Sequence, residues 1–228
     1  MTTNKLPGSD AARHGSGDAD LTIMLAAHEA FRRDLVGLAR AASFADLADP
    51  ARRESVGNGW RIFKHQLHIH HSAEDDLIWP AMRERLAHSE HAQSVLDAME
   101  DEHELIDPLL AAVDGAFDQR TVAQAGAPGA DRLADVVDAL VTTLSSHLVH
   151  EERDALPLIG MTLTAAEWRS VGRQIARKNL SSGPEMFSWM IDGAPPERAA
   201  ATLGQLPPPV RLIYRGIWKP RYAKTSRW

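Results

Sequence analysis

Residues 65–80 read HQLHIHHSAEDDLIWP, a segment with four histidines followed by three acidic residues and a Trp-Pro pair. Within it, Glu74 follows His70 by four positions, and a proline follows His70 by ten. The segment HLVHEERDALP, residues 147–157, keeps the same spacing at an offset of 77 (147 − 70) for histidine, glutamate and proline alike. This agreement indicates an internal repeat, not an isolated polar helix.

A histidine-glutamate pair also precedes each copy of the repeat. AAHEAF contains His28 and Glu29, and EDEHEL contains His103 and Glu104, at an offset of 75 (103 − 28). The chain therefore contains, twice, a helix with a histidine followed by a helix with His-x-x-x-Glu. Two such hairpins in an antiparallel bundle would be related by a pseudo-twofold axis, and their four helices would direct these side chains to one point.

The spacing suits a metal centre with two ions. Residues four apart lie on one helix face, so His70 and Glu74 can reach one ion together, as can His147 and Glu151. Imidazole suits iron, zinc and copper, and a carboxylate can bridge two ions about 3.5–4 Å apart. Four histidines and two carboxylates exceed what one tetrahedral zinc needs but fit two irons, which helical bundles hold with inward Glu and His pairs.

Apolar residues at three- and four-residue steps predict an all-α fold, an antiparallel up-and-down four-helix bundle with a C-terminal helical extension. The second helix is expected to end near Pro80, because residues before proline avoid the α region. Pro108 is expected to kink the third helix. The expected bundle helices span about 20–38, 52–79, 89–117 and 131–153, with a flexible link over QAGAPGADR.

We expect three parts along the chain. Residues 1–20 are rich in Gly, Ser, Asp and Ala and predict a disordered leader. Residues 21–160 form the bundle, and residues 161–228 form a helical extension that packs on it. From Arg211 onward the extension has six basic residues and no acid. Packing by its aromatic and basic side chains is the favoured role, whereas covering a channel, docking a partner or touching acidic lipids are alternatives, and no partner is identified.

Composition excludes several classes of protein. The net charge of −6 argues against nucleic acid as a partner. The absence of cysteine excludes disulfides, iron–sulfur clusters and thiolate zinc sites. The sequence has no stretch of about 18 apolar residues, so no transmembrane segment is predicted. The N-terminus lacks the apolar core of a secretory signal. A cytoplasmic protein is therefore expected.

The residues around His28, HHSAEDDLIWP, the residues around His103 and HLVHEERDALP together resemble the hemerythrin-like, or HHE cation-binding, family, over roughly residues 21–160. The resemblance implies a four-helix bundle with two non-heme irons (Fe²⁺/Fe³⁺) bridged by an oxo or hydroxo group and two carboxylates. The resemblance implies that His28 and His70 are ligands of one iron and that His103 and His147 are ligands of the other. It also implies that Glu74 and Glu151 are the bridging carboxylates.

The sequence departs from the oxygen-carrier pattern at one ligand. Oxygen carriers of this family have a second histidine four positions after that of the third helix, where this chain has Asp107. The fifth terminal ligand is therefore Asp107, His71 or water. A carboxylate there would favour the ferric state and weaken reversible O₂ carriage.

The neighbouring polar residues have simpler expected roles. His68, His150 and Glu152 fall off the inward faces and are expected in solvent, and His65 is a weaker candidate for contact with a ligand. Glu29 and Glu104 could each accept a proton from a ligand imidazole or form an exposed salt bridge.

The function expected from the resemblance is the binding or reduction of O₂ or peroxide at a carboxylate-bridged di-iron centre. Whether this is an enzyme, such as an oxidase or a catalase-like oxidoreductase, is left open. The alternative is an iron- or oxygen-sensing regulatory protein without turnover.

Overall fold

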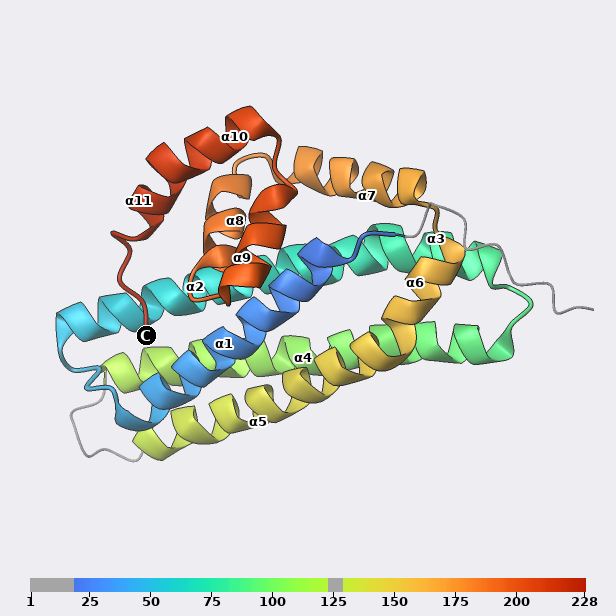
Figure 1. Cartoon of the computed structure of the whole chain (residues 1–228). Helices are drawn as coiled ribbons and strands as arrows, with labels where there is room; N and C mark the ends of the chain where they lie inside the picture. The colour runs from blue at the N-terminus through green and yellow to red at the C-terminus, as the bar shows by residue number, and fades with distance from the viewer. Residues whose placement is uncertain (1–18, 123–128) are drawn as a thin grey trace, which may run out of the picture.

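The computed structural model describes residues 19–122 and 129–228, whose helices form a bundle with a helical layer on one side (Figure 1). The expected leader (except residues 19 and 20) and residues 124–128 of the expected link lie outside the described residues. The described residues contain no strand, so the all-α prediction is confirmed. Among them, no helix combines the length and the apolarity needed to cross a membrane.

Four long helices form the antiparallel bundle (Figure 1). The second begins where Asp49 accepts a hydrogen bond from the Ala51 amide and Pro50 occupies the first helical position. Apolar residues from all four helices, such as Phe31 and Phe63, form the core between them. The helices are α1 (Thr22–Phe44), α2 (Pro50–Ala73), α4 (Glu90–Val122) and α5 (Gly129–His150).

The expected end of the second helix is wrong, because helical structure continues through Pro80. It likewise continues through Pro157, beyond the expected end of the fourth helix. A π turn η1 (Glu74–Ile78) leads from α2 into α3 (Trp79–Arg85), and η2 (Glu151–Ala155) leads from α5 into α6 (Leu156–Thr162). A proline ring clashes with the carbonyl four positions before it in an α-helix. The wider turn, in which the Trp79 amide bonds to the Glu74 carbonyl five positions back, accommodates this ring.

Helix α4 also runs through Pro108 without a break. At the far end of the bundle α3 and α6 lie together (Figure 1) and bury a second apolar cluster that includes Trp79, Met82 and Ile159. Each repeat therefore supplies a bundle helix, a π turn that begins at its glutamate, and a short terminal helix. The two glutamates thus occupy equivalent positions in the fold.

The C-terminal extension packs on the bundle. Its Trp189 is buried against Phe31, with ring centroids 4.8 Å apart, and its indole N–H donates to Asp34 Oδ2 at 2.7 Å. The Trp228 ring lies against Gly37 and Gly59, where an added Cβ would come within 2.6 and 2.8 Å of it. The extension comprises α7 (Ala165–Lys178), α8 (Gly183–Ile191), α9 (Pro196–Gly204), α10 (Pro208–Ile213), η3 (Tyr214–Trp218) and α11 (Lys219–Tyr222).

Candidate metal centre

One group of side chains that could hold a metal ion joins α1 and α2 to the two π turns. His28, His70, Glu74 and Glu151 each place a ligand atom within 4.8 Å of the others. The Nε2 atom of His28 lies 3.1 Å from His70 Nε2 and 3.1 Å from Glu151 Oε2, and His70 Nε2 lies 3.3 Å from Glu74 Oε1. We call these two histidines, with the two carboxylates beside them, the two-His half.

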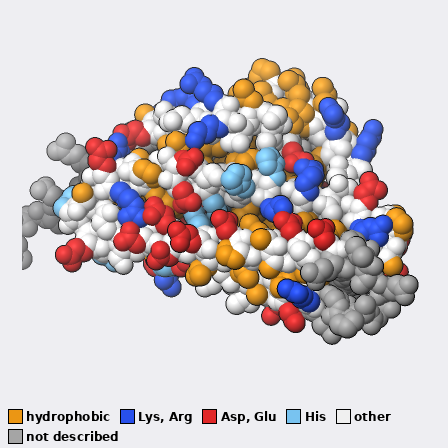
Figure 2. Space-filling view, turned by 180° about the vertical axis from the view of Figure 1, so that it is seen from behind, with side chains coloured by type: hydrophobic (Ala, Val, Ile, Leu, Met, Phe, Trp, Pro, Cys, Tyr) orange, Lys and Arg blue, Asp and Glu red, His pale blue; other side chains and the backbone are white. Residues whose placement is uncertain are grey.

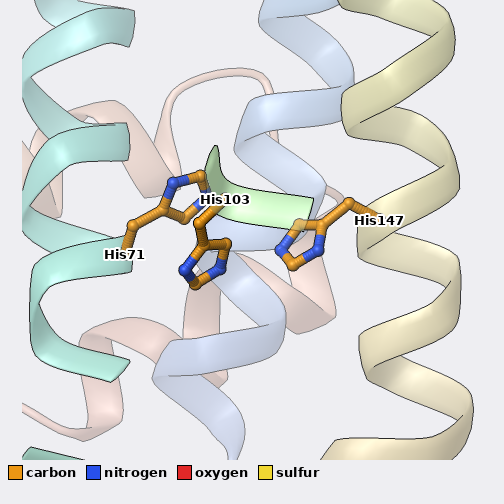
Figure 3. Close-up of side chains that lie close together, drawn as sticks. All are labelled: His71, His103 and His147. Atoms are coloured by element: carbon orange, nitrogen blue, oxygen red, sulfur yellow. The ribbon is translucent and has the colours of Figure 1, made fainter. Parts of the chain in front are cut away.

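A second group joins α2, α4 and α5. His71, His103 and His147 lie with their ligand atoms within 4.8 Å of one another, and their rings point toward one another in Figure 3. Both carboxylates also approach this group, since Glu74 Oε2 lies 3.5 Å from His103 Nε2 and Glu151 Oε2 lies 3.9 Å from His147 Nε2. We call these three histidines the three-His half.

The centre holds buried polar atoms that have no hydrogen-bond partner among the described residues. Glu74 and Glu151 are fully buried, and all four of their carboxylate oxygens are without such a partner. Burying a carboxylate without hydrogen bonds is costly unless a positive charge or a metal compensates it, and His28, 3.1 Å from Glu151, offers such a charge to one of the two. The same condition is found at Nε2 of three imidazoles, those of His71, His103 and His147. Donors of these types, left unsatisfied around one point, fit metal cations.

The electrostatics of the two carboxylates differ. Burial raises the pKa of Glu74 well above its ordinary value of 4.5, and the neighbouring Glu151 and Asp75 raise it further. Burial also disfavours the charged form of Glu151, but the positive charges of His28 and His147 outweigh this and lower its pKa. Without a cation, the pair therefore favours a proton on Glu74 and a charge on Glu151.

The histidines also divide into two kinds. Burial and the neighbouring histidines hold the pKa of His70 and that of His71 well below 6.5. Burial acts on His28 in the same direction, but Glu151 and Glu152 outweigh it and raise the pKa of His28 to about 9. Neutral imidazole is the form that binds metals. The raised pKa of His28 means that positive charge is stabilised at this position, beside Glu151 and Glu152.

Three of these histidines are oriented by carboxylates on their outer side. Nδ1 of His28 lies 2.9 Å from Glu152, and Nδ1 of His103 lies 2.9 Å from Asp75. Asp75 and Glu152 are equivalent in the repeat, because each directly follows a central glutamate. A carboxylate at Nδ1 fixes the tautomer that leaves Nε2 free toward the centre.

Glu102 orients the third histidine, since its carboxylate lies 2.8 Å from His147 Nδ1 and 2.7 Å from His150 Nδ1. The expectation that His150 and Glu152 only face solvent is therefore wrong. Both are partly exposed, but each is hydrogen-bonded within the network around a central histidine. The expectation failed because the π turn at Glu151 adds a residue to the turn, so an ideal α-helical wheel misplaces the residues near it.

Of the two glutamates that directly follow His28 and His103, one forms a salt bridge and the other has no side-chain partner among the described residues. Glu29 pairs with Arg198 of α9 at 2.7 Å. Glu104 is exposed, and no hydrogen bond or ion pair joins it to another described residue. Sequence reasoning missed Asp75 and Glu102. The repeat offset of 77 could have linked Asp75 to Glu152, whereas Glu102 has no acidic counterpart at the offset of 75 (102 − 75), where the chain has Ala27.

The remaining candidates lie around a pocket of about 830 Å³ that reaches His71 and His103. Asp107 lines this pocket but is exposed and lies outside both ligand groups. His68 is exposed as expected, and His65 Nε2 lies 2.9 Å from Ser182 Oγ of the extension, away from the ligands. Figure 2, which views the molecule from behind, shows histidine side chains at the surface between acidic and basic ones.

Comparisons with known proteins identify a family over most of the bundle. The family model for the hemerythrin HHE cation binding domain matches residues 19–159, more than half of the chain. This range includes every residue of the two halves and their orienting carboxylates. Searches among curated proteins and among solved structures return no match.

Proposed function

Because this chain belongs to the hemerythrin HHE cation-binding domain family, we propose that its bundle holds two iron ions, one in each half of the centre. The proposed ligands are His28 and His70 for one ion and His71, His103 and His147 for the other. Glu74 and Glu151 are the carboxylates shared by both. An oxo or hydroxo group completes the bridge in this proposal.

The observation that carries the proposal is the position of Glu74. Its two oxygens face different halves, with Oε1 3.3 Å from His70 Nε2 and Oε2 3.5 Å from His103 Nε2. Both oxygens are buried and have no hydrogen-bond partner among the described residues. A carboxylate in this position has the arrangement needed to bridge two ions. Zinc in a single tetrahedral site would not require it.

His71 is the proposed fifth terminal ligand, in place of Asp107. It lies with His103 and His147, whereas Asp107 is exposed outside the ligand group. The three-His half therefore has one more terminal ligand than the two-His half. A small molecule that binds directly to an ion would then find the freer coordination position in the two-His half.

The proposed activity is the binding or reduction of O₂ or peroxide. Two iron ions held in this way would supply one-electron redox steps toward such molecules. The chain's own residues orient the imidazoles through Glu152, Asp75 and Glu102. The Phe31 ring packs beside His70, with ring centroids 5.3 Å apart, and the buried Trp189 packs on Phe31 at 4.8 Å.

The test is to load metal-free protein with ferrous iron under argon and then to admit air or hydrogen peroxide. We expect two irons per chain, absorption bands of an oxo-bridged diferric centre, and consumption of peroxide. A Glu74→Ala variant serves as the control that should show neither iron nor bands. Zinc retained in preference to iron, or a single iron per chain, would refute the proposal, whereas iron binding without any reaction would favour a sensing role.

A further inference from the structure

The pocket beside the three-His half connects the surface with the centre. It lies between α2, α4 and the segment between α7 and α8, with a volume of about 830 Å³. His71 and His103 are exposed by only 7% and 5%, yet both line it. The Nε2 atoms of both rings are buried and have no hydrogen-bond partner among the described residues. The inner end of the pocket is therefore formed by two histidines whose unsatisfied Nε2 atoms lie buried behind its wall.

The side chains nearer the surface divide into paired and unpaired groups. The basic residues of the wall are compensated, since Arg61 pairs with Glu185 at 2.8 Å and Lys64 pairs with Asp114 at 2.6 Å. The side chain of Asp107, in contrast, is exposed on the pocket wall and forms no hydrogen bond or ion pair with another described residue. The unpaired groups of the wall thus include a carboxylate available to a cation.

His68 is the second unpaired group. The His68 side chain is exposed, lines the same pocket and forms no hydrogen bond or ion pair with another described residue. Carboxylate and imidazole are both ligands for ferrous iron. Together with His71 and His103 they form a series of donors from the surface to the centre.

No residue of the two-His half lines this pocket. His28, Glu74 and Glu151 are fully buried, and none of them lines the pocket. His70 is partly exposed, and the Phe31 ring packs beside its ring at 5.3 Å. Within the part of the chain that the structure describes, this pocket therefore leads a hydrated cation to the side of His71 and His103.

We propose that this pocket is the route by which divalent iron enters the centre, with Asp107 and His68 as transient first ligands and His71 and His103 as the acceptors. The inference rests on the proposed function, since it concerns how the proposed ions arrive. It assigns Asp107 a role in the rate of loading and none in the final ligand set. It also implies that the three-His half fills first and that the second ion passes along the shared carboxylates.

The experiment follows uptake of Co²⁺, which has visible absorption, by metal-free full-length protein in a stopped-flow instrument. We expect the double variant Asp107→Asn, His68→Gln to load about tenfold more slowly, near the lower end of the effect of a charge-lined cleft on association rates. The final content should stay at two Co²⁺ per chain with an unchanged spectrum. Ser181→Trp, at the exposed rim of the pocket, should slow loading by obstruction while leaving every proposed ligand in place.

The matched control is the double variant Asp101→Asn, His88→Gln, which removes the same groups from exposed positions outside the pocket and should load at the wild-type rate. Equal loading rates in the wild type and the pocket variants would overturn the route but leave the metal centre intact. Loss of final Co²⁺ content in the pocket variant would also overturn it, because Asp107 or His68 would then be a resident ligand. A wild-type protein that takes up no Co²⁺ would refute the proposed centre itself.

Discussion

The two halves of the centre derive from two copies of one sequence pattern, yet they differ in ligands and in access. The three-His half borders the pocket, whereas no residue of the two-His half lines it. The additional ligand candidate of the three-His half is His71, whose counterpart at the repeat offset (71 + 77) is the fully buried Leu148. The repeat therefore provides a symmetric frame, and single residues in one copy make its two halves unequal.

The orienting residues follow the same division. Asp75 and Glu152 preserve the symmetry, since each binds the histidine contributed by the first helix of the opposite hairpin. Glu102 breaks it, because it orients His147 and its counterpart in the first hairpin (102 − 75) is Ala27. Shared and unshared residues can thus be tested separately.

The largest effect is expected from a residue that both halves share. Glu74→Gln should abolish binding of both ions, because the neutral amide cannot bridge them. The same change should raise the thermal midpoint of the metal-free protein by about 2–4 °C, or ~1 kcal/mol for a chain of this size, because a buried ionisable group is removed. Metal analysis and calorimetry measure the two effects. Retention of one ion at full occupancy would show that the halves do not depend on Glu74 together.

The pH dependence of the metal-free protein provides a second check on Glu74. The pKa of Glu74 is raised in the folded protein. The folded chain therefore keeps a proton that the unfolded chain releases once the pH exceeds the ordinary pKa of 4.5. The unfolding free energy of the wild type should therefore fall as the pH rises above 4.5. In Glu74→Gln this part of the slope should disappear in urea titrations. An identical slope in both proteins would place the effect on another group.

A smaller effect, confined to one half, is expected from His71→Leu, which gives the first copy the residue of the second. The ion of the three-His half should lose affinity by at least the ~10–100-fold that loss of an outer partner costs. The ion of the two-His half should be retained, as competition with a chelator would show. His68→Leu, on the exposed side of the same helix, should leave both equilibrium affinities unchanged. Equal weakening of both ions would mean that His71 acts on the whole centre.

Removal of an orienting carboxylate should have a more modest effect. Glu102→Gln should lower the affinity of the three-His half about tenfold, the lower end for an outer partner of a ligand histidine. Glu152→Gln should do the same to the two-His half through His28. Glu104→Gln, exposed on the same helix as Glu102, is the matched control and should change neither affinity. If chelator competition showed that one of these substitutions weakens metal binding in both halves, the idea that each carboxylate supports only its own half would be contradicted.

The smallest effect is expected outside both halves. Glu167 caps α7 through Thr164 and pairs with Arg85, and these contacts lower the pKa of Glu167 to about 2. The contribution of Glu167 to stability is therefore fully present above pH 4.5 and is lost as the pH falls through about 2. Glu167→Gln should lower the thermal midpoint at neutral pH slightly and leave both metal affinities unchanged. A loss of bound metal would show that α7 supports the centre.

The sequence alone was sufficient for the helical fold and for six of the side chains that meet at the centre. Their spacing sufficed because residues four apart must share a helix face, and the repeat doubled the signal. It failed at Pro80, where the second helix was expected to end, because the π turns before Pro80 and Pro157 let the helices continue and depend on packing beyond the local sequence. The same turns hid the roles of Asp75 and Glu152.

His71 could not be chosen over Asp107 from sequence for a related reason. Both lie near inward positions of their helices, and the choice depends on the rotation of α2 and α4 about their axes, which packing of the whole bundle sets. The packing of Trp189 against Phe31 was equally inaccessible, since the two rings belong to α8 and α1, which lie far apart in the sequence. Contacts of this kind carry no local pattern.

The most direct test of the central claim is to count and probe the irons of anaerobically reconstituted, then air-oxidised, protein by metal analysis with Mössbauer and EPR spectroscopy. A centre bridged by Glu74 and Glu151 predicts two irons per chain in a diamagnetic, EPR-silent diferric ground state, because bridged ferric ions couple antiferromagnetically. One iron per chain, or two irons with the EPR signals of isolated ferric ions, would contradict it.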